Sequence, residues 1–125
     1  MTSGSRGSRT LTTHVLDTAR GRPAAGVRVD LSAVEADGRL RLIRTMRTNA
    51  DGRTDTPLLS EGEMGAGRYE IAFHVGDYFR AAGVALADPP YLDVVPVRFG
   101  VAEIDAHYHV PLLVSPWSYA TYRGS

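Results

Sequence analysis

The chain of 125 residues contains no cysteine and no lysine. Without cysteine, disulfide bonds, thiol catalysis and cysteine-based zinc sites are excluded. All fourteen basic residues are arginine, so Schiff-base and lysine-nucleophile mechanisms are excluded as well. Fourteen acidic residues balance the arginines, and the net charge is zero. Because no basic stripe interrupts this balance, we expect no nucleic-acid partner.

Long apolar runs are also missing. A membrane-spanning helix needs about 20 apolar residues, and a secretory signal needs roughly 7–15 after a basic start; the sequence offers neither. We therefore expect a cytoplasmic protein with no membrane partner. Residues 1–9 are small and polar, and we expect a disordered tail there. Residues 10–125 suffice for one domain whose core needs no disulfide or structural metal.

Short β-like runs separated by turn residues make up the rest of the chain. Residues 27–34 and 39–46 alternate apolar and polar side chains on either side of an Asp-Gly pair, which is a hairpin signal. Pro96 and Pro111 lie inside two later runs and are therefore expected at edge or irregular positions. The pattern predicts an all-β fold, a β-sandwich of about eight strands with one short helix. The remaining predicted strands are 11–17, 54–59, 67–75, 92–101, 107–114 and 117–123, and the helix is 78–83.

Two residues of the first half of the chain are candidates for chemistry. His14 lies in the strand 11–17 and shares a face with Thr12 and Leu16, because side chains alternate along a strand. Taken alone, such a histidine is more often structural than catalytic. Arg53 follows an Asp-Gly turn, and a turn-flanking arginine is usually solvated, although its guanidinium is a planar fork of donors suited to a planar polar ligand.

The second half of the chain supplies a histidine pair. His107 and His109 are two residues apart, hence on one face of a strand, and such a pair can chelate a metal. No third ligand occurs at convincing spacing, so no metal site is predicted. His74 is expected to be structural or exposed. The final residues 122–125, Tyr-Arg-Gly-Ser, combine a phenol, a guanidinium, a hydroxyl and a carboxylate, all of which can hold a planar polar ligand.

Four blocks of the sequence occur in an informative order. They are Leu-Thr-Thr-His-Val-Leu-Asp at 11–17, Thr-Asn-Ala-Asp-Gly-Arg at 48–53, Gly-Asp-Tyr-Phe at 76–79, and the segment 107–125, which runs from His-Tyr-His to Tyr-Arg-Gly-Ser. Together the blocks resemble the 5-hydroxyisourate hydrolases, the enzymatic branch of the transthyretin-related family. The resemblance covers the whole chain after the nine-residue tail.

The resemblance favours the enzymes of that family over its hormone carrier. Transthyretin lacks counterparts of His14, Arg53 and His109 and continues past the Tyr-Arg-Gly-Ser point. The family implies a homotetramer of β-sandwiches, a dimer of dimers, in which two subunits complete each site in a central channel. It also implies hydrolytic opening of the six-membered ring of 5-hydroxyisourate to 2-oxo-4-hydroxy-4-carboxy-5-ureidoimidazoline, with no metal or organic cofactor.

The resemblance gives each site residue an expected role. His109 is the general base and His14 holds water and substrate, or the two histidines exchange these roles. Arg53 stabilises developing negative charge on the substrate. Tyr122 and Arg123 bind the ring. Ser125 orients a histidine through its hydroxyl or carboxylate.

Three other interpretations compete with this one. A transthyretin-like carrier would bind a small aromatic ligand without turnover, but a polar set of His14, Arg53 and His109 is unlike the apolar lining of such sites. A generic immunoglobulin-like interaction module gives no account of the terminal tetrapeptide. An acyl-enzyme route through Ser115 or Ser118 lacks the glycine pattern of a nucleophile elbow.

Overall fold

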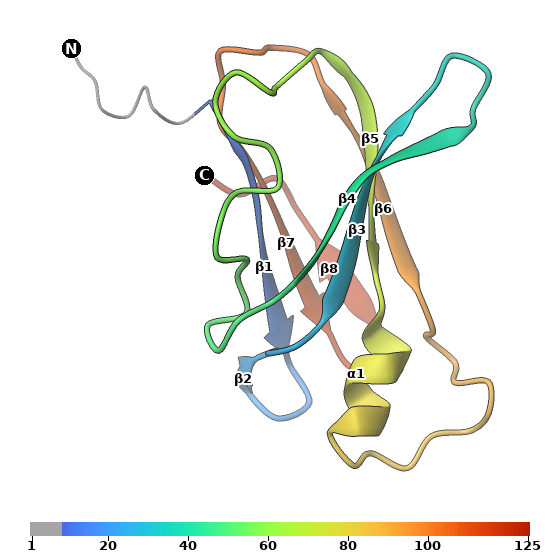
Figure 1. The fold of residues 1–125 in the computed structure, drawn as a ribbon. Coiled ribbons are helices and arrows are strands. Elements are labelled where there is room, and N and C mark those ends of the chain that lie inside the picture. Colours follow the sequence, from blue (N-terminus) through green and yellow to red (C-terminus); the bar gives the residue numbers. More distant parts are fainter. Residues whose placement is uncertain (1–8) are drawn as a thin grey trace.

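Two four-stranded sheets pack face to face in the computed structural model, which describes residues 9–125, and one helix lies at an end of the sandwich (Figure 1). The sheet orders are β2-β1-β7-β8 and β4-β3-β5-β6. The elements are β1 (Leu11–Asp17), β2 (Arg22–Pro23), β3 (Arg28–Val34), β4 (Leu40–Arg47), β5 (Gly67–Phe73), α1 (Val75–Ala81), β6 (Val95–Val101), β7 (Tyr108–Val114) and β8 (Tyr119–Thr121). This architecture confirms the predicted all-β sandwich. The predicted tail lies outside the described residues except for Arg9, which is paired with Glu61 and Asp105.

The core lies between the inner faces of the two sheets. Along β1, residues alternate between buried and partly exposed, as expected of a strand with one face on a core. Val15 and Leu112 from the first sheet and Leu31, Ile71 and Phe73 from the second are fully buried. Thr12, His14 and Leu16 share one face of β1, as the sequence predicted, and the structure shows that this is the outer face of the first sheet.

The predicted strand 54–59 is wrong. The chain there runs beside β1 and is bridged to it at Leu59, which pairs with Leu11, while Arg53, just before the segment, is bridged to His14 (Figure 1). Leu58 and Leu59 are both buried, which breaks the alternation that a strand needs, and Pro57 has no N–H for a ladder. The eighth strand is instead β2, a two-residue strand between the predicted strands 11–17 and 27–34. The helix also begins earlier than predicted, at Val75, which shortens the strand before it.

Both prolines occupy the kinds of position that their missing N–H allows. Pro96 lies in β6, an edge strand. Pro111 lies in the inner strand β7. The N–H of Tyr108 in this strand points to β1, and backbone N–H groups alternate in direction along a strand. The nitrogen of Pro111, three residues later, therefore faces β8. The ladder to β8 is interrupted there, and the hydroxyl of Thr121 donates to the Pro111 carbonyl at 2.7 Å instead of a backbone partner.

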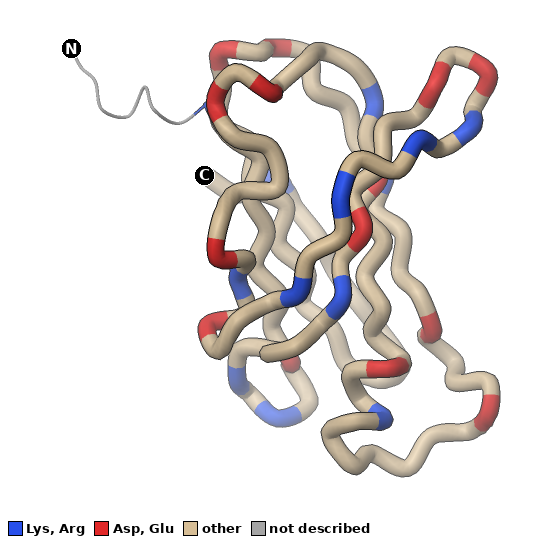
Figure 2. The backbone as a smooth tube through the Cα atoms, viewed as in Figure 1, with Lys and Arg blue, Asp and Glu red and all other residues tan. Residues whose placement is uncertain are grey.

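Charged residues lie mainly on the second sheet and on the loops, and in the first sheet only β1 and β2 carry any (Figure 2). Residues 106–122, which include β7 and β8, contain no Asp, Glu, Lys or Arg. Among residues 9–125, no helix is long and apolar enough to cross a membrane.

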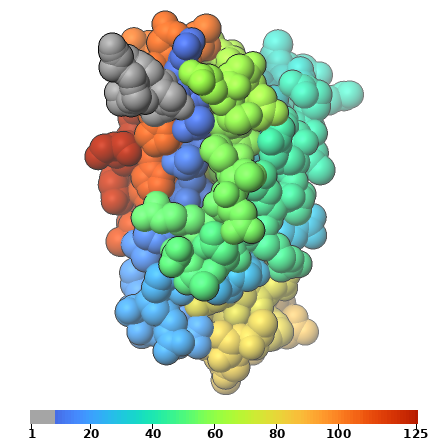
Figure 3. Space-filling model, turned by 60° about the vertical axis from the view of Figure 1, so that its left-hand side comes forward, coloured from blue at the N-terminus to red at the C-terminus, as the bar shows by residue number. Residues whose placement is uncertain are grey.

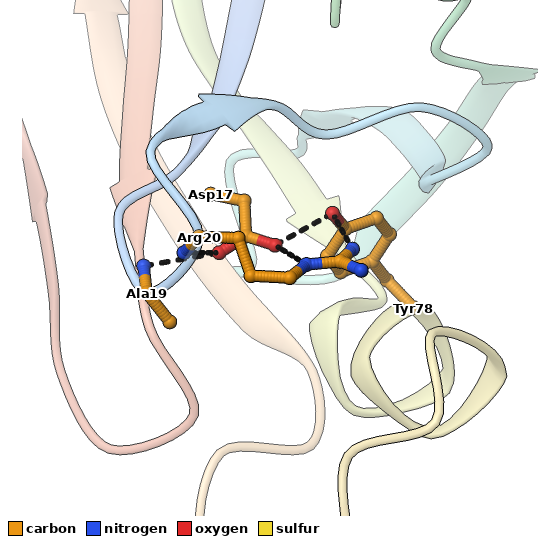
Figure 4. A network of polar contacts seen from close by, with 4 residues as sticks. All are labelled: Asp17, Ala19, Arg20 and Tyr78. Carbon is orange, nitrogen blue, oxygen red and sulfur yellow. Dashed lines mark hydrogen bonds and ion pairs between the residues drawn. The ribbon is translucent and has the colours of Figure 1, made fainter.

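A buried carboxylate ties the end of β1 to the helix (Figure 4). Asp17 is 1% exposed, and its Oδ2 accepts hydrogen bonds from the Tyr78 hydroxyl at 2.7 Å and from Arg20 Nε at 2.9 Å. Its Oδ1 accepts the backbone N–H groups of Ala19 and Arg20. Burial raises the pKa of Asp17, but the hydrogen bonds from Tyr78 and Arg20 outweigh it and leave that pKa below its ordinary value. The carboxylate therefore stays charged and holds two of the sequence blocks together.

Removal of the Tyr78 hydroxyl tests this network. We expect Tyr78→Phe to lower the free energy of unfolding at pH 7 by about 1.5–3 kcal/mol, the usual range for a hydrogen bond to a charged group. The pKa of Asp17 is lower in the folded state than in the unfolded state. The loss of unfolding free energy should therefore be complete above the pKa of Asp17 in the unfolded chain, about 3.9, and should shrink as the pH falls through the pKa of Asp17 in the folded protein. Urea denaturation at one protein concentration measures it.

Tyr91→Phe is the matched control, because Tyr91 is 78% exposed. Its effect should stay within about 0.5 kcal/mol. Equal effects of the two substitutions would contradict a structural role for the network.

Candidate active site

A cavity of about 370 Å³ opens on the outer side of the first sheet, beside β1 and β7. Figure 3 shows this side, with β1 between β7 and the segment that follows β4. Residues predicted for the site line the cavity from three separate parts of the chain. The lining consists of Thr12, Thr13, Arg53, Thr54, Asp55, Thr56, Pro57, His107, His109 and Ser125.

The parallel pairing of β1 with β7 brings the histidines together. Thr12 lies opposite His109 and His14 opposite Pro111, so both histidines and Thr12 share the outer face of the sheet. The buried hydroxyl of Thr13 donates to the Val110 carbonyl at 2.6 Å and reinforces this register. Two segments almost a hundred residues apart in sequence thus position one polar cluster.

A tight turn places Arg53 beside His14. The Asn49 side chain accepts the N–H groups of Asp51 and Arg53, and the Arg53 carbonyl accepts the N–H of Asn49 at 2.7 Å. Gly52 has a φ of +76°, and a Cβ there would lie 2.4 Å from the Val15 carbonyl oxygen. Only glycine therefore lets the turn approach β1 closely enough for the bridge between Arg53 and His14.

The hydrogen bond of His14 fixes its tautomer. Its Nε2 lies 2.8 Å from the carbonyl oxygen of Asp51. A carbonyl only accepts, so Nε2 carries the proton, and in neutral His14 the lone pair is on Nδ1. Arg53 and His109 line the cavity and His14 is bridged to Arg53 at its border.

His109 has a surrounding that favours its neutral form. Burial lowers its pKa, and the nearby Arg53, His107 and His14 lower that pKa further. Its Nδ1 lies 2.8 Å from the Thr12 hydroxyl. With Nδ1 engaged in this way, Nε2 is the nitrogen that remains to meet a water or a substrate. A neutral imidazole of this kind suits a general base.

The end of the chain divides between two cavities. The Gly124 N–H donates to the His109 carbonyl at 2.8 Å, and a Cβ at Gly124 would lie 2.5 Å from Cδ2 of His109. Ser125 lines the cavity described above. Tyr122, 61% exposed, and Arg123 line a neighbouring cavity of about 410 Å³ that shares His109 with the first, and the Arg123 guanidinium lies 4.3 Å from the centre of the Tyr108 ring.

The predicted site residues are thus brought together in part. His14, Arg53, His109 and Ser125 meet at one cavity or its border, whereas Tyr122 and Arg123 lie on the other side of His109. In the described part of the chain no hydrogen bond joins Ser125 to a histidine, so its orienting role stays a prediction, as do the substrate contacts of the other residues.

His107 and His109 stack with their ring centres 6.3 Å apart and their planes 12° apart. Over residues 9–125, no group of three or more His, Cys, Asp or Glu side chains gathers as a metal site would. His74 lies in the region of the helix and pairs with Asp30 at 2.9 Å, far in the fold from the histidine cavity.

A third cavity, of about 480 Å³, lies between the helix and the loop before β3. Arg20 and Arg28 line it, but their guanidinium groups are already paired with Asp17 and Asp30. None of the predicted site residues lines this cavity. The candidate active site is therefore the cavity of the histidines and Arg53.

The sequence did not reveal the contact between Thr12 and His109. The position of Thr12 on the same face as His14 was the available signal, but the partner strand was not predictable from it. The ordering role of Asn49 in the turn was missed for a similar reason, because an Asn two residues before an Asp-Gly pair only indicates a turn.

Comparison with known proteins places these residues in a family. The model of the HIUase/Transthyretin family matches residues 11–124. The 5-hydroxyisourate hydrolase 2 of Rhizobium meliloti is 61% identical over 115 residues, which cover 92% of this chain and 95% of that protein.

Two solved structures have the same fold. The 5-hydroxyisourate hydrolase of Klebsiella pneumoniae superimposes with a TM-score of 0.76 at 35% identity, over 93% of this chain and 98% of the other. A sea bream transthyretin in complex with thyroxine superimposes with a TM-score of 0.82 at 33% identity, over 92% and 94% of the two chains. From the family model, the closely similar Rhizobium protein and the shared fold, it follows that this chain belongs to the HIUase/Transthyretin family.

Proposed function

We propose that residues 10–125 form a hydrolase that opens the ring of 5-hydroxyisourate to 2-oxo-4-hydroxy-4-carboxy-5-ureidoimidazoline in urate catabolism. The observation that carries this proposal is the convergence of His14, Arg53 and His109 at one cavity. The high identity to a protein named as this hydrolase supports it. The cytoplasmic location expected from the sequence stays part of the proposal.

The three residues divide the tasks of hydrolysis. His109, neutral at pH 7, takes a proton from water at Nε2 as the water attacks the carbonyl carbon of the ring. Arg53 stabilises the negative charge that develops on the carbonyl oxygen. The same imidazole then returns the proton to the leaving nitrogen, and the ring opens. His14, whose Nδ1 lone pair is free, holds the water or the substrate.

The carrier of a small aromatic ligand is the weaker alternative. The sea bream transthyretin has the same fold but is 33% identical, against 61% for the Rhizobium hydrolase. A charged guanidinium and two imidazoles at the cavity also favour reaction over simple binding of an apolar ligand.

We also propose that the protein is a homotetramer, a dimer of dimers. The uncharged run 106–122 carries three exposed aromatic side chains, Trp117 (66%), Tyr119 (45%) and Tyr122 (61%). The strand β8 is at the edge of its sheet. An unpaired edge and an exposed apolar patch are features that association between copies would cover.

Turnover of freshly generated 5-hydroxyisourate tests the function. The protein should speed the decay of its absorbance well beyond the spontaneous rate, and His109→Asn should slow kcat about 10²–10⁴-fold, the range typical of a lost general base. His74→Asn removes a histidine that pairs with Asp30 and lies outside the cavity. It should leave kcat nearly unchanged. A wild-type protein without turnover would reject the hydrolase, and equal loss in both variants would reject the role of His109.

The pH profile tests the charge around His109. Since the base must be neutral, kcat/KM should rise with pH through a pKa below the ordinary histidine value and level off above that pKa. Arg53→Gln removes a nearby cation, so the pKa of His109 should increase and the rising limb should move to higher pH. The maximal rate should fall about 10²–10³-fold through the lost donor.

Arg22→Gln removes an exposed arginine of β2 and serves as the control for this experiment. The rising part of its pH profile of kcat/KM should coincide with that of the wild type. If the rising part of the Arg53→Gln profile also stayed in place, the guanidinium would not act on His109.

Gly124→Ala tests the contact between the chain end and His109. The new methyl group would lie 2.5 Å from Cδ2 of the ring, so the imidazole or the chain end must move. A shift of the imidazole by about 1 Å should lower kcat on the order of 10²-fold, while the free energy of unfolding should stay unchanged. Gly65→Ala, whose methyl would meet the Tyr69 hydroxyl at an ordinary 3.5 Å, should stay as fast as the wild type. Full activity of Gly124→Ala would show that the chain end does not position His109.

A further inference from the structure

Four side chains at the rim and wall of the cavity form a continuous chain of polar contacts that the three tasks above do not use. The Thr10 hydroxyl lies 3.0 Å from Nδ1 of His107. The Thr12 hydroxyl lies 3.4 Å from Nε2 of His107 and 2.8 Å from Nδ1 of His109. Thr12 therefore bridges the two stacked rings through one oxygen atom.

Two arrangements of this chain have the Thr12 hydroxyl donating to one ring and accepting from the other. In the first, His109 Nδ1–H donates to Thr12, the Thr12 hydroxyl donates to His107 Nε2, and His107 Nδ1–H donates to Thr10. In the second, His107 Nε2–H donates to Thr12 and the Thr12 hydroxyl donates to His109 Nδ1, while His107 Nδ1–H still donates to Thr10. The lone pair of His109 Nε2 is free in the first arrangement, and Nε2 carries the proton in the second.

We infer that Thr12 and His107 are positioning residues that switch His109 between base and acid. The first arrangement presents the base and the second presents the acid. His107 holds the transferred proton between the two steps, and Thr12 passes it. This inference rests on the proposed hydrolase function.

The proton transfers balance over one turnover. As a water O–H proton moves to His109 Nε2, the His109 Nδ1 proton moves to Thr12 and the Thr12 proton moves to His107 Nε2. The water oxygen forms its bond to the ring carbonyl carbon, and His107 becomes an imidazolium while His109 stays neutral. As the C–N bond breaks, His109 Nε2–H protonates the leaving nitrogen. At the same time the Thr12 proton moves to His109 Nδ1 and the His107 Nε2 proton moves to Thr12, so both rings are neutral again and the first arrangement is restored.

The surroundings of His109 explain why the proton would not stay there. Burial lowers its pKa, and the nearby Arg53, His107 and His14 lower that pKa further. A positive charge at His109 is therefore costly. Transfer through Thr12 keeps His109 neutral throughout and leaves the positive charge on the second ring.

Thr12→Val and Thr12→Ser form the first test. Valine has nearly the shape of threonine but no hydroxyl, so kcat should fall about 10–100-fold, the cost typical of losing a group that orients a functional histidine. KM should change less than about twofold, since the loss affects the chemical step. Serine keeps the hydroxyl and should restore kcat to within about threefold. Equal slowing by valine and serine, or no slowing by valine, would overturn the inference.

A double-mutant cycle with His107→Gln separates a relay from two independent contacts. Residues that act as one unit lose activity non-additively. The double variant Thr12→Val/His107→Gln should therefore be about as slow as the slower single variant. If the fold loss of kcat in the double variant equalled the product of the losses in the two single variants, the relay would be overturned. His74→Gln makes the same change of side chain at a histidine outside the cavity and should retain wild-type kcat.

Nitrogen NMR of the imidazole rings gives a test that needs no turnover. In the wild-type protein above the pKa of His109, Nδ1 of that ring should be protonated and Nε2 should not. In Thr12→Val the preference should be lost and the two tautomers should mix. An unchanged tautomer in Thr12→Val would overturn the inference even for an active enzyme. Conversely, absent turnover by the wild-type protein would reject the proposed function while the NMR result still decides the role of Thr12.

Discussion

The parallel pairing of β1 with β7 is the constraint on which the site depends. It places Thr12 opposite His109 and keeps His14 on the same face. A slip of one residue in either strand would turn that strand's polar side chains into the core and its apolar ones to solvent. The fully buried Leu11, Val15 and Leu112 oppose such a slip, because their burial fixes the register by the hydrophobic effect. The chemistry of the outer face is thus held in place by the packing of the inner one.

The sequence blocks that identify the family are structural as much as chemical. In the first block His14 faces the cavity region, whereas Asp17 is buried and bound to Tyr78 of the third block. In the second block Gly52 allows the approach that brings Arg53 to β1. The blocks therefore contain residues that determine where the candidate site residues lie, in addition to those site residues themselves.

Local pattern predicted the parts of the fold that depend on neighbours in sequence. Alternation gave the strands around the core and the face that His14 shares with Thr12, and the resemblance of the four blocks gave the candidate site residues. The segment 54–59 was mispredicted because Leu58 and Leu59 are both buried and only an isolated bridge, Leu59 with Leu11, forms in place of a ladder. The contact of Thr12 with His109 and the separation of Tyr122 from Ser125 depend on register between distant segments. No pattern within one segment encodes such a register.

The missing N–H of Pro111 has a consequence for the motion of the molecule. It interrupts the ladder between β7 and β8 after Thr121, and pairing resumes only where Gly124 meets His109. The last few residues are therefore joined to the sheet by far fewer hydrogen bonds than any strand of the core. Local opening costs less free energy than global unfolding where few bonds must break. The chain end that forms part of the cavity wall is therefore the part of this sheet whose local opening should cost the least free energy, while both sheets remain intact.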